Sequence, residues 1–219
     1  MYTRPLLFTF DVLGTLVDWR RGLSGAAARA GRPLREGEFD RVVDRQAVLE
    51  QERPGWTYRE VTRQSLVDVL GIPTDAADAI GAEVGTWPPY PDSAGALRRL
   101  MAVAPCAAIT NSDLVHGEQA QAALGVRLSA WLCAQELGCY KPDLHVFELA
   151  SERLGVAPGP AWWHVSAYAD YDLAPADMLG ITTIYVRRPH ARPGRAEHEV
   201  ADLAGLADLV EGIRWCAPA

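Results

Sequence analysis

Four short segments of the 219-residue chain carry the side chains best suited to chemistry. They are Asp11-x-x-Gly14-Thr15-Leu16, Thr110-Asn111-Ser112, Tyr140-Lys141-Pro142 and an acidic loop with Asp170 and Asp172. A carboxylate held by a tight turn is suited to act as a nucleophile, and pairing with Lys141 keeps Asp11 ionised near neutral pH. Hydroxyl and amide groups such as those of Thr15, Thr110 and Asn111 can hold a carboxylate or an oxyanion. An acidic side chain in the last loop can orient water.

Short apolar runs precede most of these polar groups and predict the elements that position them. Residues 6–10, 105–110, 161–166 and 181–186 are typical of strands buried on both faces. Helix-period stretches lie at about 93–103, 114–124, 143–154, 173–179 and 202–214. This alternation predicts an α/β fold, a mostly parallel sheet with helices on both faces. The ligand site of such a fold lies beyond the carboxyl ends of the strands.

Residues 18–90 depart from the alternation. They contain helix-like stretches at about 22–30, 36–52, 57–70 and 74–86 and no convincing strand. The segment 87–92 that follows has three prolines in six residues, which stiffens the return to the sheet. The sequence therefore predicts two domains: a core of residues 1–17 and 91–219, and an inserted all-helical cap of residues 18–90.

Composition excludes several functional classes. The formal net charge is −7 and the pI is about 5.2, so the chain has no overall attraction for nucleic acid or for an anionic membrane. No targeting segment or membrane span is expected. The cysteines and histidines lack metal-ligand spacing, so we expect reduced thiols, structural or exposed histidines, no metal site and a cytoplasmic protein. These residues are Cys106, Cys133, Cys139 and Cys216, and His116, His145, His164, His190 and His198.

The segment Phe10-Asp11-Val12-Leu13-Gly14-Thr15-Leu16-Val17-Asp18 resembles motif I of the haloacid dehalogenase-like hydrolase superfamily. The other three segments follow in the order that this superfamily shows, and together they extend over the whole chain. The resemblance implies a three-layer Rossmann-like core with a cap domain. It also implies that Asp11 is a covalent nucleophile.

Leu13 decides between the branches of this superfamily. Phosphatases carry a second aspartate at this position, which protonates the leaving oxygen, and leucine cannot do so. The 2-haloacid dehalogenases have a bulky apolar residue there, because a halide leaves without a proton. The segments Asp18-Trp19 and Tyr140-Lys141-Pro142 also look like the dehalogenase branch, and Arg45-Gln46 is similar to its halide-receiving Arg-Gln pair.

The resemblance to 2-haloacid dehalogenases implies an SN2 attack by Asp11 on C2 of a short 2-haloacid, followed by hydrolysis of the resulting ester. Lys141 would steady Asp11 and the oxyanion, and Asp172 would activate water, with Asp170 as the alternative. No cofactor is implied. The substrate-binding residues would be Leu13, Thr15, Arg45, Thr110, Asn111, Phe147 and Ser166.

Departures from the dehalogenase pattern keep other functions open. Phe147 replaces an expected tyrosine, and Val165–Asp172 differs from the usual last motif. One alternative is a Mg²⁺-dependent phosphatase with Asp170 and Asp172 near the metal. Another is a catalytically idle binding or scaffolding protein. We expect a small anionic substrate and a chain compatible with a homodimer. The sequence leaves the leaving group, the stereochemistry and the oligomeric state undetermined.

Overall fold

A parallel sheet forms the centre of the core, as the alternating pattern predicted. The computed structural model describes residues 3–213. Within them, six strands pair in the order β3-β2-β1-β4-β5-β6, and every pair is parallel. The strands are β1 (Leu7–Phe10), β2 (Cys106–Thr110), β3 (Ala130–Cys133), β4 (Trp162–Ser166), β5 (Thr182–Val186) and β6 (His198–Val200). The sequence missed β3 and β6.

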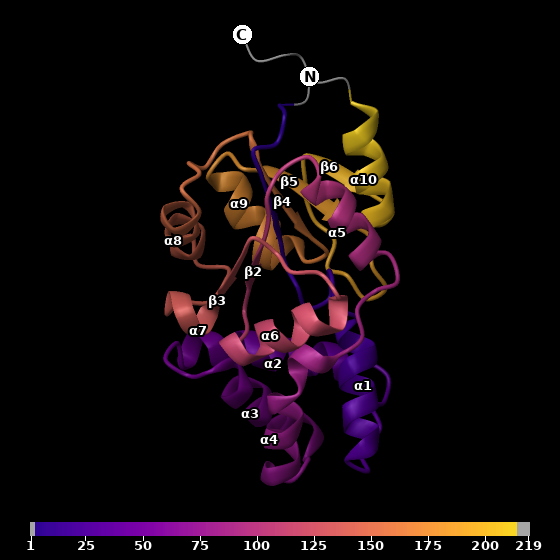
Figure 1. The fold of residues 1–219 in the computed structure, drawn as a ribbon. Helices are drawn as coiled ribbons and strands as arrows, with labels where there is room; N and C mark the ends of the chain where they lie inside the picture. The colour runs from indigo at the N-terminus through magenta and orange to yellow at the C-terminus, as the bar shows by residue number, and fades with distance from the viewer. Residues whose placement is uncertain (1–2, 214–219) are drawn as a thin grey trace.

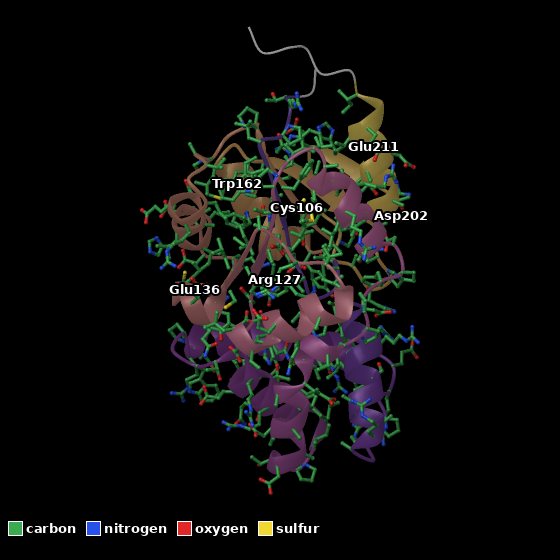
Figure 2. All side chains as sticks on the ribbon, viewed as in Figure 1. Cys106, Arg127, Glu136, Trp162, Asp202 and Glu211 are labelled. Carbon is green, nitrogen blue, oxygen red and sulfur yellow. The ribbon has the colours of Figure 1, made fainter. Side chains whose placement is uncertain are left out.

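Helices cover both faces of the sheet and give the three layers of the core (Figure 1). Helices α5 (Ser93–Met101) and α10 (Leu203–Gly212) pack with one apolar cluster that includes Phe8, Phe10 and Trp163. Helices α8 (His145–Leu154) and α9 (Ala174–Met178) pack on the other face with a second cluster around Trp162. Figure 2 shows Trp162 and Cys106 within the sheet region, and neither side chain has exposed surface.

The remaining elements of the core are short or lie at its edge. They are α6 (Leu114–Leu124), α7 (Ala134–Leu137) and a π-helical turn, η2 (Ala169–Leu173). Cys106, Cys133 and Cys139 are free thiols, and Cys216 lies outside the described residues. No helix among residues 3–213 is long and apolar enough to cross a membrane.

A group of helices lies beyond the carboxyl ends of the strands (Figure 1). It consists of α1 (Trp19–Arg29), α2 (Glu38–Glu52), α3 (Tyr58–Leu70), α4 (Thr74–Ala82) and the short 3-10 helix η1 (Val84–Thr86). Asp18 caps α1, and Thr57 and Glu60 form a capping box at the start of α3. We call α1–α4 and η1 the cap helices. The division into domains at residues 18 and 90 stays a prediction.

The cap helices are tied to the core by the segment that follows β2. Both carboxylate oxygens of Asp113 accept backbone N–H bonds from the first turn of α3, at 2.8 Å from Tyr58 and 2.9 Å from Arg59. The ring nitrogen Nε2 of buried His116 lies 2.9 Å from the carbonyl oxygen of Gly81 at the end of α4. These bonds hold the cap helices over the end of the sheet, where the candidate site lies.

Candidate active site

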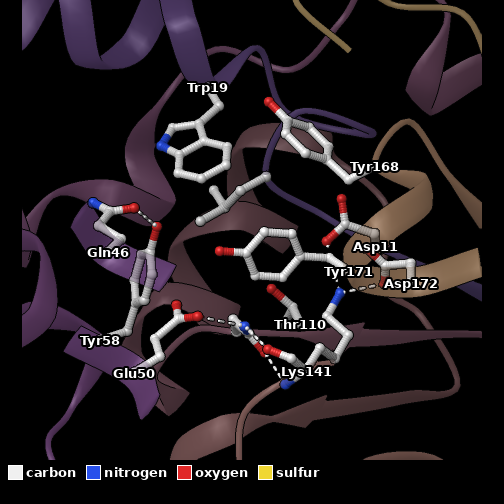
Figure 3. Close-up of a pocket in the computed structure, with 12 residues that line it drawn as sticks. Asp11, Trp19, Gln46, Glu50, Tyr58, Thr110, Lys141, Tyr168, Tyr171 and Asp172 are labelled. Carbon is white, nitrogen blue, oxygen red and sulfur yellow. Dashed lines mark hydrogen bonds and ion pairs between the residues drawn. The ribbon is translucent and has the colours of Figure 1, made fainter. Parts of the chain in front are cut away.

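A buried lysine joins two carboxylates beyond the ends of β1 and β4 (Figure 3). The Nζ of Lys141 donates to Oδ1 of Asp11 at 3.0 Å and to Oδ1 of Asp172 at 2.5 Å. A third bond, 3.0 Å long, goes to the carbonyl oxygen of Ile109. All three charged side chains are buried. Lys141 therefore places the predicted nucleophile and the predicted water-activating acid around a single positive charge.

The turn after β1 holds Asp11 from the opposite side. The Thr15 hydroxyl donates to Oδ2 of Asp11 at 2.7 Å and accepts the backbone N–H of Ala167 at 3.0 Å. Gly14 has φ +90°, which favours glycine, and a Cβ at this position would lie 2.3 Å from the Tyr168 ring. Thr15 is thus engaged with the nucleophile itself, and its hydroxyl is already used.

Burial and the shared lysine shift the pKa values of this cluster. Burial raises the pKa of Asp11, and the attraction of Lys141 offsets this only in part. Burial also acts upward on Asp172, but the combined effect of Lys141 and His164 lowers its pKa. The two carboxylates overcome the effect of burial on Lys141 and raise its pKa, so the lysine stays charged at neutral pH.

A chain of hydrogen bonds runs from the interior of the sheet to Asp172. Trp162 Nε1 donates to Thr9 Oγ1 at 2.7 Å, and Thr9 Oγ1 lies 2.7 Å from His164 Nδ1. His164 Nε2 in turn lies 3.0 Å from Asp172 Oδ1. Because the indole can only donate, Thr9 accepts its bond and donates its own proton to Nδ1, which leaves the His164 proton on Nε2. Ser166 completes the set by donating to Asp172 Oδ2 at 3.0 Å.

The end of β2 fixes the backbone of Lys141. Asn111 accepts the Lys141 backbone N–H on Oδ1 at 2.8 Å and donates from Nδ2 to the Lys141 carbonyl at 3.0 Å. Its Nδ2 also donates to Glu50 Oε2 at 3.1 Å. The neighbouring Thr110 hydroxyl is buried and has no hydrogen-bond partner among residues 3–213. Of these two predicted substrate-binding residues, Thr110 has the free donor.

The cap helices close a cavity of about 40 Å³ over Asp11 (Figure 3). Trp19 from α1, Gln46 and Glu50 from α2 and Tyr58 from α3 contribute to its wall. The Gln46 amide is engaged at both ends, because it accepts the Tyr58 hydroxyl at 3.0 Å and donates to Ser65 at 3.2 Å. The full lining is Asp11, Leu13, Trp19, Gln46, Glu50, Tyr58, Thr110, Asn111, Lys141, Tyr168, Tyr171 and Asp172.

Four predicted substrate-binding residues do not line this cavity, and one of them is Thr15, whose hydroxyl is bonded to Asp11. Arg45 lies outside and pairs with Asp68 at 2.7 Å and with Glu52 at 3.6 Å. Phe147 is fully buried against the sheet, with its ring 5.0 Å from that of His164. Ser166 is bonded to Asp172, as described above.

Asp170, the alternative to Asp172 as the water-orienting acid, is also absent from the lining. Its carboxylate is exposed and lies 3.5 Å from the Arg192 guanidinium. In residues 3–213, no three or more His, Cys, Asp or Glu side chains are grouped in a way that could hold a metal ion.

Sequence reasoning missed Glu50 and His164. Burial raises the pKa of Glu50 to about 8, with Lys141 and the Asn111 hydrogen bond acting more weakly downward. For Glu50 the signal is the apolar helix face that it shares with Phe39, Val43 and Leu49. For His164 a signal exists, because residues 162, 164 and 166 share one face of a strand. Because alternate side chains of a strand point to the same face, His164 lies beside Ser166 on the face that meets Asp172.

The comparisons with known proteins agree with this geometry. The model of the haloacid dehalogenase-like hydrolase family matches residues 6–163. Over 130 residues the chain is 34% identical to (S)-2-haloacid dehalogenase 4A of Burkholderia cepacia and 31% identical to (S)-2-haloacid dehalogenase 1 of a Pseudomonas species. These alignments cover 55% of this chain and 54% and 56% of the relatives, so the chain spans about half the length of the curated relatives it matches.

A solved structure shows the same architecture. The L-2-haloacid dehalogenase of Xanthobacter autotrophicus superposes with a TM-score of 0.82 at 21% identity, over 96% of this chain and 100% of that one. At this identity the likeness concerns the fold alone. The matched proteins come from the branch that the motifs around Asp11 and Lys141 indicated. With the family model covering most of its length, the chain belongs to the haloacid dehalogenase-like hydrolases.

Proposed function

We propose that this protein removes halide from a short 2-haloacid through an ester formed on Asp11. The observation that carries the proposal is the buried contact of Asp11 with Lys141 at 3.0 Å, at a cavity where Leu13 lines the wall. Leucine cannot protonate a leaving group, and a halide needs no proton to leave. The names of the matched relatives support the same substrate class.

The first step joins a carboxylate oxygen of Asp11 to C2 of the substrate. The C2–halogen bond breaks as this bond forms, and the halide leaves with the bonding electron pair. Thr15 and Lys141 hold the two oxygens of Asp11 in one orientation, which favours a collinear attack. The proposal assigns no residue to receive the halide, because Arg45 is paired with Asp68 outside the cavity in this structure.

The second step returns Asp11 to its free form. Water adds to the side-chain carbonyl carbon of the Asp11 ester, and Asp172 takes a proton from that water. Lys141 stabilises the oxyanion, which collapses to the Asp11 carboxylate as the leaving oxygen takes the proton of the added hydroxyl and departs as a 2-hydroxyacid; Asp172 then releases its proton to solvent. The lysine ammonium supplies the positive charge at every stage, so the proposed mechanism uses no metal or cofactor.

The size of the cavity supports a short substrate. A water molecule needs about 10–15 Å³ of such space, so a cavity of about 40 Å³ holds only a few heavy-atom centres. Two- and three-carbon acids suit this volume. The phosphatase alternative has no observation in its favour, because Leu13 replaces the second aspartate and Asp170 faces Arg192 outside the lining.

Halide release from chloroacetate, bromoacetate and each enantiomer of 2-chloropropionate, measured with EDTA present, tests the proposal. We expect release by the wild-type protein, and a loss of at least about a thousandfold with Asp11→Asn. A mass increase on the Asp11 peptide during turnover would identify the ester. The exposed Asp75→Asn variant is the matched control and should keep full activity. Full activity of Asp11→Asn, or no halide from any of these acids, would contradict the proposal.

A further inference from the structure

Glu50 is a buried carboxyl group that the mechanism above does not use. It lies on α2, lines the cavity opposite the sheet, and is 6% exposed. Its one hydrogen bond within residues 3–213 is accepted by Oε2 from Asn111. No arginine, lysine or histidine of the described chain lies within ion-pair distance of it. A carboxylate with so little compensation is costly to bury, so the neutral acid is the favoured form.

Charged and titratable groups surround Glu50, but none of them forms an ion pair with it within residues 3–213. The charge of Lys141 lowers the pKa of Glu50, but its ammonium group is already shared by Asp11 and Asp172. Arg53, which follows the last residue of α2, lies against the Trp56 ring. The groups that face Glu50 from other elements are Tyr58, Tyr140, Lys141 and Tyr171, with Asp143, Asp170 and Arg192 around the open hollow on its outer side.

The hydrogen bond from Asn111 determines which oxygen of Glu50 carries the proton. Because Oε2 accepts the Asn111 amide, the proton belongs on Oε1. Figure 3 draws Glu50 among the residues that line the cavity, with one of its two oxygens hydrogen-bonded. Thr110 is buried without a hydrogen-bond partner in the described part of the chain. The lining of one cavity therefore offers two O–H donors, from Glu50 on α2 and from Thr110 at the end of β2.

We propose that Glu50, as a neutral acid, donates its Oε1 proton to the carboxylate of the substrate beside the Thr110 hydroxyl. This inference rests on the substrate class of the proposed function. A carboxylic acid donating to a carboxylate forms a short, charge-assisted hydrogen bond. An ionised Glu50 would instead repel the same substrate, because the lining would then hold three carboxylates and one ammonium.

Affinity for small carboxylic acids should therefore fall as pH rises through the Glu50 pKa of about 8. Propionate, which cannot react, measures this directly by calorimetric titration of the wild-type protein. Between pH 6.5 and 9.5 we expect its binding to weaken by about 30-fold, one decade for each pH unit above the pKa. Glu50→Gln keeps a donor but cannot ionise, so its affinity should match the wild type at pH 6.5 and stay constant to pH 9.5. Glu52→Gln, an exposed change on the same helix, should behave as the wild type.

Infrared difference spectra provide a second readout that needs no ligand. A protonated-carboxyl band at pH 7 that disappears in Glu50→Gln is expected, and its absence would overturn the inference. A parallel loss of propionate affinity in the wild type and Glu50→Gln would also overturn it, as would no binding at all. Tenfold tighter binding by Glu50→Gln at pH 6.5 would reveal an ionised, repelling carboxylate and lead to the same conclusion.

Turnover separates this inference from the proposed function. Halide release whose kcat/KM is equally pH-dependent in wild type and Glu50→Gln would leave the dehalogenase proposal standing and remove Glu50 from it. Absence of halide release, together with propionate binding that weakens at high pH only in the wild type, would remove the reaction and leave an acid-binding site.

Discussion

A single buried histidine, His164, connects the interior of the sheet to the carboxylate that the proposed mechanism uses to activate water. The Thr9 hydroxyl fixes its Nδ1 as an acceptor, so Nε2–H points at Asp172. The bonds from His164 and Ser166 occupy acceptor positions on both oxygens of Asp172 and hold the carboxylate in one orientation. We infer that His164 is a positioning residue, because it touches Asp172 and is buried away from the cavity lining.

Replacing His164 with phenylalanine should therefore slow ester hydrolysis more than ester formation. We expect a loss of about tenfold or more in kcat, with the Asp11 ester accumulating. Rapid quenching followed by mass spectrometry measures the trapped ester. His164→Gln, whose amide can still donate to Asp172, should recover part of the rate, and exposed His145→Phe is the control. Equal slowing of both steps by His164→Phe would contradict a role in positioning Asp172.

Much of the site was predictable residue by residue, because local motifs mark it. Asp11 and Lys141 are recognisable from their immediate neighbours, and the structure brings them into contact. Arg45 and Glu50 were not resolved in this way. Both lie on α2, and a shift in helix phase decides which of them meets the core. The apolar stripe of α2, which includes Phe39, Val43 and Leu49, places Glu50 on the buried face, whereas the prediction for Arg45 followed the resemblance to an Arg-Gln pair.

Among the elements, α3 depends on a cap that comes from elsewhere in the chain. Asp113 accepts the backbone N–H groups of Tyr58 and Arg59, in addition to the local capping box of Thr57 and Glu60. A carboxylate at a helix N-terminus both satisfies free donors and interacts favourably with the helix dipole. Asp113 thereby joins the cap helices to the loop that follows β2.

Asp113→Ala should lower the free energy of unfolding by about 1–3 kcal/mol, because the N–H groups of buried Tyr58 and of Arg59 lose their acceptor. Chemical denaturation followed by circular dichroism measures this change. Asp75→Ala is the matched control, since Asp75 also lies in the first turn of a helix but is exposed. A loss no larger than that of the control would show that Asp113 does not hold α3.

The strands that the sequence missed are short and incompletely buried. β3 has four residues and two of them are only partly buried, while β6 has three residues. Runs of this length give no clear periodicity, and each is stabilised by pairing with a strand that is already in place. The longer apolar runs of β1, β2, β4 and β5 were identified to within a residue. The cytoplasmic location and the homodimer stay predictions.

For the molecule as a whole, covering the sheet with the cap helices buries the Glu50 carboxyl. Its pKa of about 8 in the folded protein lies above the ordinary value of 4.5. The unfolded chain therefore releases this proton at a lower pH than the folded one. Below pH 4.5 Glu50 is neutral in both states and does not reduce the free energy of unfolding. Between pH 4.5 and about 8 it ionises only in the unfolded chain, so the free energy of unfolding falls as pH rises through this range.

Glu50→Gln removes this penalty, so the difference in melting temperature between Glu50→Gln and wild type should grow as pH rises from 5 to 8. Each unit of difference between the folded and unfolded pKa of a group corresponds to about 1.4 kcal/mol in the free energy of unfolding. Differential scanning calorimetry can measure a change of this size. Glu52→Gln should show no such trend, because Glu52 is exposed. A difference independent of pH would mean that Glu50 titrates normally.

The contact between Gly14 and Tyr168 also links two distant positions of the sequence. A methyl group on residue 14 would meet the Tyr168 ring at 2.3 Å, in addition to the strain of a positive φ. During divergence these two sites cannot drift independently. A larger residue at position 14 is compatible only with a smaller side chain at position 168, which is 154 positions later in the sequence. Replacing Tyr168 in this way would also change the shape of the cavity over Asp11.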